Sequence, residues 1–136
     1  MSDTESEYSE EYYEELFKKT DDEFPDCDFN ISIFNKLEDF DELDKSFTEE
    51  KTILIKDDRT SASYFFSDLT KDEKSKYIHY TTVKQINNKP ITLRQILNAM
   101  CNDEHYKMMR EIQCPHNFLE GFDKTNNLVY EAGFGS

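Results

Sequence analysis

Four residues in the second half of this 136-residue chain carry the side chains best suited to chemistry: Cys101, His105, Cys114 and His116. Zinc prefers thiolate and imidazole ligands, and a structural zinc ion takes four of them at ~2.0–2.3 Å in a tetrahedron. The spacing C-x3-H-x8-C-x-H matches no established zinc signature. A small zinc-stabilised adaptor is therefore one interpretation of these residues. The other is ordinary packing of buried thiols beside partly exposed imidazoles.

The same side chains could form a nucleophilic pair, with Cys114 activated by His116 or His105. No group that would stabilise an oxyanion accompanies them in the sequence. Paired carboxylates such as Asp57 and Asp58 are frequent, but acid–base catalysis needs unequal burial to separate two pKa values, and a solvated run does not provide it. All three glycines lie near the C-terminal end, so there is no Gly-rich phosphate loop. We therefore predict no enzymatic activity.

The negative charge of the chain is concentrated at one end. Residues 1–50 hold 19 acidic and four basic residues, whereas residues 51–136 hold 11 acidic and 12 basic ones, and the whole chain has a formal charge of −14. An acidic block beside a balanced one is typical of an interaction arm attached to a folded module. We predict an aromatic-containing acidic arm over residues 1–50, partly disordered or packed on the body, and an α+β module over residues 51–136.

Aromatic residues stand within the acidic block, in DDEFPDCDF and EDFDELDKSF. A ring that buries in an apolar notch, with carboxylates around it that pair with lysine and arginine, is one way to bind a basic protein. Residues 22–24 and 38–40 resemble segments that histone chaperones use. The predicted partner-binding residues are Phe24, Phe29, Phe40, Phe47, Asp22, Glu23, Glu38 and Asp39. The alternative is that these rings pack on the protein's own sheet.

The charge also limits the class of partner. An acidic field repels phosphate backbones and anionic lipids, so we expect neither direct nucleic-acid binding nor membrane binding. A basic partner is favoured, either a histone-like or a nucleic-acid-packaging protein. The alternative function is that of a DNA mimic that inhibits a nucleic-acid-binding protein. Tyr77, Tyr80, Lys84 and Lys89 could make an aromatic-basic strand face for single strands, but the nearby acidic residues weaken that interpretation.

Cysteine usage and the start of the chain predict an intracellular protein. Three cysteines, an odd and sparse set, do not indicate a disulfide framework. The first residues are acidic, unlike a signal peptide, and no apolar run approaches the ~18–20 residues of a membrane span. We expect the cytosol or the nucleus.

Local patterns predict the elements that position these residues. Ser9 is a good N-cap for a helix that begins after it, and Thr92 is one for a helix over residues 93–100. A further helix is expected over residues 103–112. Strands are expected at residues 29–34, 51–56, 61–66, 77–86 and 128–134. Residues 116–122, HNFLEGF, have the composition of an aromatic loop. The sum is an α+β fold with a small mixed or antiparallel sheet and two or three helices.

The segments KPITLRQILNAM, HNFLEGF and VYEAGFGS resemble short, mostly uncharacterised proteins of nucleocytoplasmic large DNA viruses. The resemblance covers residues 89–136, about a third of the chain, and it carries no catalytic motif. It implies a viral setting, with the protein in a host cell or in the virion and with a virion protein as its basic partner, and no particular reaction.

Overall fold

The computed structural model describes residues 9–60 and 64–135, and it confirms the predicted α+β class with a mixed sheet. The helices are α1 (Glu10–Glu23), α2 (Lys71–Lys74), α3 (Leu93–Cys101) and α4 (Glu104–Glu111), with 3-10 turns η2 (Leu37–Glu42), η3 (Tyr64–Phe66) and η4 (Ser75–Tyr77). The strands are β1 (Asn30–Ile31), β2 (Ser46–Thr48), β3 (Thr52–Asp57), β4 (His79–Lys84), β5 (Ile91–Thr92), β6 (Phe118–Lys124) and β7 (Val129–Gly135).

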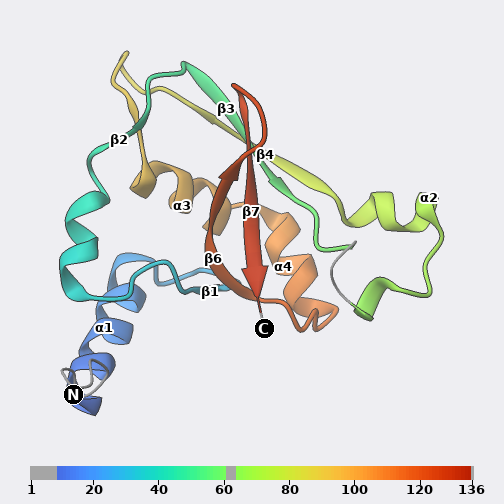
Figure 1. The fold of residues 1–136 in the computed structure, drawn as a ribbon, viewed down its shortest axis with the longest axis horizontal. Coiled ribbons are helices and arrows are strands. Elements are labelled where there is room, and N and C mark those ends of the chain that lie inside the picture. The colour runs from blue at the N-terminus through green and yellow to red at the C-terminus, as the bar shows by residue number, and fades with distance from the viewer. Residues whose placement is uncertain (1–8, 61–63, 136) are drawn as a thin grey trace, which may run out of the picture.

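The main sheet has five strands in the order β1-β6-β7-β3-β4. β1 runs parallel to β6 and β7 runs parallel to β3, whereas the β6–β7 and β3–β4 pairs are antiparallel. β2 and β5 form a separate two-stranded sheet. Helices α3 and α4 lie along one face of the main sheet, and α1 lies toward the end where β1 is found (Figure 1). The fold is thus a two-layer arrangement with the helices on one side.

The helix starts follow from their caps. The Ser9 hydroxyl accepts a hydrogen bond from the Tyr12 N–H, and the Thr92 hydroxyl accepts one from Gln95 N–H, so both predicted N-caps are confirmed. The Asp103 carboxylate caps α4 in the same way, through the backbone N–H of His105. Each cap satisfies a backbone donor that the first turn of a helix leaves without a partner.

The strands β3 and β4 bury alternate residues. Ile53, Ile55 and Asp57 point to the buried side of β3, and Thr81 and Val83 do so in β4. The strands predicted at residues 51–56 and 77–86 are therefore confirmed. Alternation of this kind follows from the two-residue period of a pleated strand, and it carries a charged side chain, Asp57, inward along with its apolar neighbours.

Two local predictions are wrong. Tyr64–Phe66 form the 3-10 turn η3 rather than part of a strand, and residues 61–63 of that predicted strand lie outside the described residues. Residues 116–122 were expected as a loop, but most of them belong to β6, which pairs with both β1 and β7. Pairing with two neighbours stabilises this strand in spite of Gly121, a residue that weakens strands locally.

A single main core joins the two halves of the chain. The N-terminal half contributes a buried set that packs with the sheet and with α3: Leu16, Phe24, Phe29, Phe34, Phe40 and Leu43. A smaller cluster holds Phe66, Met109 and Cys114. Residues 9–50 are therefore packed on the rest of the protein, and their aromatic residues supply much of the buried apolar area that the acidic composition would otherwise lack.

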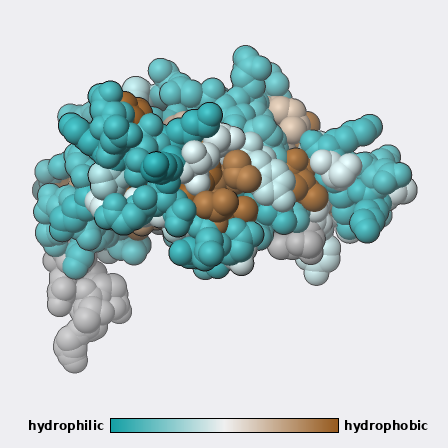
Figure 2. Space-filling view, turned by 90° about the horizontal axis from the view of Figure 1, so that it is seen from above, coloured by the Kyte–Doolittle hydropathy of each residue, from teal (hydrophilic) through white to brown (hydrophobic). Residues whose placement is uncertain are grey.

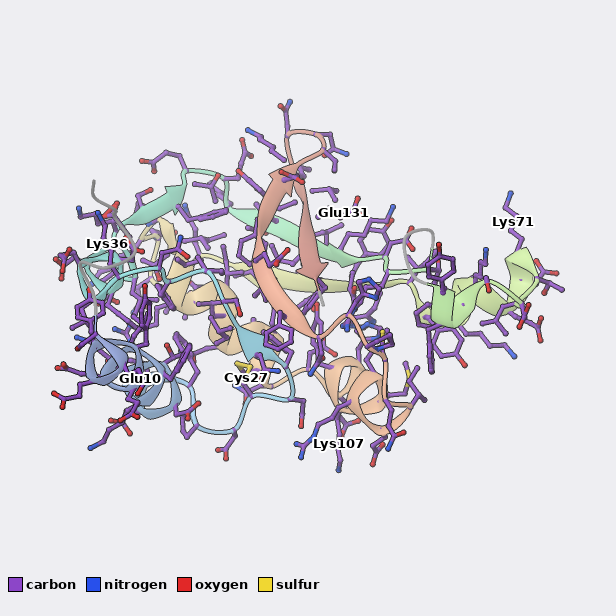
Figure 3. The ribbon with its side chains drawn as sticks, turned by 60° about the horizontal axis from the view of Figure 1, so that its bottom comes forward. Glu10, Cys27, Lys36, Lys71, Lys107 and Glu131 are labelled. Carbon is purple, nitrogen blue, oxygen red and sulfur yellow. A yellow bond between two sulfur atoms is a disulfide. The ribbon has the colours of Figure 1, made fainter. Side chains whose placement is uncertain are left out.

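A disulfide between Cys27 and Cys101 also joins the two halves, and it lies beside β1 in Figure 3. The expectation of unpaired cysteines is therefore wrong for these two residues. Cys114 is a free, buried thiol. Two cysteines 74 residues apart give no local signal, because their approach depends on the docking of the segment before β1 against the end of α3.

Within the described residues, no helix combines the length and the apolar character that crossing a bilayer would require.

Candidate functional site

The helix α1 presents a row of exposed carboxylates: Glu10, Glu11, Glu14, Glu15, Asp21 and Asp22. None of them forms an ion pair with another described residue. The space-filling view shows a mainly hydrophilic surface with small separate apolar patches (Figure 2), and Glu10 stands at the solvent-facing start of α1 in Figure 3. We call these six carboxylates the acidic face. Lys18 lies among them on the same side of α1, and the net charge of this side stays negative, which raises the local concentration of cationic ligands.

A groove with a mixed polar and apolar lining lies beside the acidic face, between α1, the segment that leads into β1, and the start of β6. Phe17 and Phe118 stand on its rim with 65% and 40% of their surfaces exposed, and Phe24, Phe29 and Ile31 line its interior. Its volume is about 250 Å³. This is below the ~300–1,000 Å³ of ordinary small-molecule pockets. The groove therefore suits one large side chain of a partner rather than a whole ligand.

Three of the four aromatic anchors predicted from the sequence are buried, and the fourth, Phe47, is partly buried. Phe24, Phe29 and Phe40 are buried with 4–6% of their surfaces exposed, and Phe47 packs against Tyr130 and Phe122. A ring that is already buried in the protein's own core has little apolar area left for a partner, so burial argues against an anchoring role for Phe24, Phe29 and Phe40. The partner-binding role of these residues stays a prediction. The alternative of packing on the protein's own sheet describes them.

The four predicted flanking acids divide into two pairs. Asp22 and Glu38 are exposed, as a partner-binding role requires. Glu23 forms an ion pair with Arg94, and the Asp39 carboxylate accepts hydrogen bonds from the backbone N–H groups of Asn35 and Lys36. The second pair is thus engaged within the protein.

The structure does not bring the four predicted zinc ligands together. Cys101 is bonded to Cys27, and His105 is hydrogen-bonded to a carboxylate. The thiol of Cys114 donates to the backbone oxygen of His116, and no hydrogen bond joins it to an imidazole of a described residue. No group of three or more histidine, cysteine or acidic side chains among the described residues has an arrangement that would hold a metal ion. The predicted nucleophilic pair requires a base bonded to the Cys114 thiol, and no described imidazole is bonded to it.

A different polar cluster occupies the junction of β3, β4 and α4. At its centre the fully buried Asp57 carboxylate accepts bonds of 2.9 Å from Arg59 Nε and 2.8 Å from Arg59 Nη2. Arg59 is itself buried, with its Nη1 donating to the backbone oxygen of His116 at 2.6 Å and its guanidinium 3.8 Å from the centroid of the Phe134 ring. A buried carboxylate is stable only with such a complete set of donors.

Two imidazoles extend this cluster toward the surface. His105 Nε2 lies 2.7 Å from Asp57 Oδ2, and His79 Nε2 lies 2.7 Å from Asp103 Oδ2. The two rings stack, with centroids 4.5 Å apart and planes 14° apart. Asp103 also accepts bonds from the Thr81 hydroxyl at 2.8 Å and from the His105 N–H at 3.0 Å. We call these residues the histidine cluster: two carboxylate–imidazole pairs placed face to face.

The surroundings shift the pKa values of the carboxyls in this cluster. Burial raises the pKa of Asp57, but hydrogen bonds from His105 and Arg59 and the charge of Arg59 outweigh it, so the pKa lies below its usual value. The pKa of Asp103 is also lowered. Burial raises it, but hydrogen bonds from His105, His79 and Thr81 lower it by more. Burial, reinforced by Asp57, raises the pKa of Tyr106, whose hydroxyl has no hydrogen-bond partner of normal geometry among the described residues.

The histidine cluster opens onto a shallow surface depression. His79 is about one-third exposed there, and the lining includes Glu104, Lys107, Met108 and Glu111. Lys107 extends from α4 on the side away from the sheet in Figure 3. Ionisable groups with specific charged partners in a concave site mark a candidate functional region. An imidazole oriented by a carboxylate can accept and return a proton.

The sequence-based interpretation missed Asp57, Arg59, His79 and Asp103. Asp57 and Asp58 were treated as a solvated pair, which is wrong for Asp57 because it is fully buried. A signal was present: Asp57 continues the alternation of Ile53 and Ile55, so the strand period alone places it on the buried face. The pairing of His79 with Asp103 had no such signal, because it depends on where α4 packs against β4.

Comparison with known protein families, with curated proteins and with solved structures finds no match to this chain. The resemblance to viral proteins therefore stays a prediction.

Proposed function

We propose that this protein binds a basic segment of another protein through the acidic face and the groove beside it. The observation that carries the proposal is the unpaired carboxylate row of α1, which borders a groove with an exposed ring, Phe17, on its rim. Fixed negative charge accelerates the encounter with a cationic partner, and an apolar notch supplies the contact that holds it.

The groove favours a partner segment of defined chemistry. Its lining combines aromatic rings with polar side chains and includes Asp21, one of the six carboxylates that stand along the adjoining helix. A side chain such as leucine or phenylalanine fits the groove, and lysine or arginine residues on either side of it fit the acidic face. A histone-like tail or the basic segment of a packaging protein has this composition. Phe17 thereby takes the anchoring role that the sequence assigned to the phenylalanines of the core.

A labelled synthetic peptide tests the proposal. The peptide carries one central phenylalanine flanked by lysine and arginine, and its binding to the full chain is followed by fluorescence anisotropy at ~0.05 M and ~1 M salt, where screening acts over about 14 Å and 3 Å respectively. We expect binding at low salt and a loss of at least about tenfold in affinity at high salt. Affinity that does not change with salt contradicts an electrostatic mode.

Matched variants separate the ring from the charge. Phe17→Ala should weaken binding by about tenfold or more if the ring is an anchor, whereas Ile86→Ala, which truncates a similarly exposed apolar side chain outside the groove, should not. Glu14→Gln with Asp21→Asn removes two charges from the acidic face, and Asp68→Asn with Asp123→Asn removes two exposed charges elsewhere. Equal effects of the two double variants would show that only net charge matters, and would remove the assignment to α1.

A further inference from the structure

We propose that this protein hydrolyses small, uncharged carboxylic esters in the depression between β4 and the start of α4, and that His79 is the general base of this reaction. This site is separate from the acidic face and from the groove. It also departs from the sequence-based expectation of no activity, because the pairing of His79 with Asp103 is visible only in the fold.

The first support is the orientation of the His79 ring. Asp103 is an acceptor at neutral pH, so the contact of 2.7 Å places the ring proton of a neutral imidazole on Nε2. Nδ1 then carries the lone pair, and it has no hydrogen-bond partner among the described residues. His79 is about one-third exposed in the depression, so this lone pair is available to a ligand. A carboxylate that fixes the tautomer and supports the imidazolium is the usual arrangement around a catalytic histidine.

The second support is the rigidity of the arrangement. Asp103 is held by the Thr81 hydroxyl and the His105 N–H as well as by His79, and it caps α4. The ring of His105 stacks on the ring of His79 and is itself fixed by Asp57, which Arg59 holds from the other side. A base whose position is fixed before substrate binds does not lose that freedom during the reaction.

The lining of the depression indicates the class of substrate. Glu104 and Glu111 disfavour polyanionic ligands such as phosphate esters, and Met108 offers apolar contact. Lys107 also belongs to the lining, and although its side chain extends away from the sheet, it adds a positive charge beside the two glutamates. No group of described residues is arranged to hold a metal ion. Carboxylic esters have leaving groups that a single general base can expel, which makes them the suitable class.

The proposed reaction balances with water as the only co-reactant. His79 Nδ1 takes a proton from water while the water oxygen bonds to the acyl carbon, which gives a tetrahedral oxyanion and an imidazolium that Asp103 stabilises. Collapse of the intermediate breaks the bond to the alkoxy oxygen, and the imidazolium returns its proton to that oxygen. The products are a carboxylic acid and an alcohol, and the base is regenerated.

Steady-state hydrolysis of 4-nitrophenyl acetate by the full chain, with ester in large excess, tests the proposal. We expect turnover faster than that of 4-methylimidazole at equal concentration, and a fall of about 10²-fold in kcat/KM for His79→Gln. The matched control is His116→Gln, since the side chain of His116 lies outside the histidine cluster, and it should keep the rate within about twofold. A rate no faster than that of 4-methylimidazole, or one that survives in His79→Gln, overturns the proposal.

Asp103 is a positioning residue, so its role is tested by a measurement that shows which nitrogen of the His79 ring carries the proton. Asparagine is as good an N-cap as aspartate, so Asp103→Asn should leave α4 intact. It should lower kcat more than it changes KM, because its amide can donate to Nε2 and move the ring proton to Nδ1. Two-bond nitrogen–proton NMR spectra of the unsubstituted protein report the tautomer directly. A proton found on Nδ1 of neutral His79 overturns the proposal even if every variant fails to fold.

Discussion

Carboxylates occur in two opposite settings in this protein. On α1, six of them face solvent without forming ion pairs with described residues, whereas in the histidine cluster Asp57 and Asp103 are each enclosed by several donors. The residue type is the same, and the difference lies in what the fold places around it. Exposed charge acts at a distance on a partner, while enclosed charge fixes the position and protonation of its neighbours.

The contrast is sharpest between adjacent residues. Asp57 is fully buried against Arg59 and His105, while Asp58 is partly exposed and, among the described residues, accepts bonds from the backbone and hydroxyl of Thr60. One step along a strand reverses the face to which a side chain points. A count of acidic residues therefore describes the surface of this protein well and says nothing about its polar interior.

The largest expected effect comes from removing the enclosed charge. Asp57→Asn leaves Arg59 buried without a counter-charge and removes the carboxylate acceptor of His105, so the free energy of unfolding should fall by as much as about 5 kcal/mol. Urea denaturation followed by circular dichroism measures it. Asp58→Asn is the matched control and should change stability by no more than about 1 kcal/mol, because its bonds lie within one turn. Similar losses for both variants would erase the distinction between the two settings.

Reduction of the disulfide tests how firmly the acidic half is attached to the rest. Cys27 and Cys101 are 74 residues apart, and the loop that they close restricts the unfolded chain enough to contribute about 4 kcal/mol. We expect the urea midpoint to fall on addition of dithiothreitol, with one cooperative transition kept because both halves share the main core. Cys114→Ser serves as the reference protein in both conditions. A transition that splits in two after reduction would show that residues 9–50 unfold separately.

Acid should destabilise the protein through the enclosed carboxyls. Because the pKa values of Asp57 and Asp103 are lowered in the folded state, the unfolded chain binds more protons at acidic pH. The stability that these carboxyls contribute is therefore complete above the unfolded pKa of about 4 and is lost as pH falls through the folded values. Urea midpoints between pH 6 and pH 3 measure this loss, and Asp103→Asn should flatten the decline. If the urea midpoint of Asp103→Asn falls with pH as steeply as that of the unsubstituted protein, Asp103 does not contribute to the loss of stability in acid.

Local signals in the sequence predicted part of this fold. Ser9 and Thr92 predict the helices that follow them, because capping involves only the next few residues. The composition of residues 51–56 predicts β3. The strand β6 was missed because its own composition, with Gly121 and several polar residues, is weak for a strand; it is stabilised by a hairpin with β7 and by pairing with the distant β1. Tertiary pairing overrides local preference in such segments.

The candidate sites were harder to predict for the same reason. The histidine cluster joins Asp57, His79 and Asp103 from three separate segments, and nothing short of the β3–β4 register and the packing of α4 brings them together. The sequence shows where the aromatic residues of the acidic half occur, but it does not show which of their side chains are buried and which are exposed. Phe17 and Phe24 both lie among acidic residues in the sequence, yet 65% of the surface of Phe17 and 4% of the surface of Phe24 are exposed.

The smallest expected effect has the opposite sign and completes the comparison. Asp22 lies in the last turn of α1, which holds no basic residue, and there the helix dipole disfavours negative charge. Asp22→Asn should therefore stabilise the protein by about 0.5 kcal/mol, where Asp57→Asn destabilises it. The gain should shrink as salt screens the charge, so urea midpoints are compared at low and high ionic strength. A loss of stability would mean that the acidic face helps to hold the fold, and that its charge is not free for a partner.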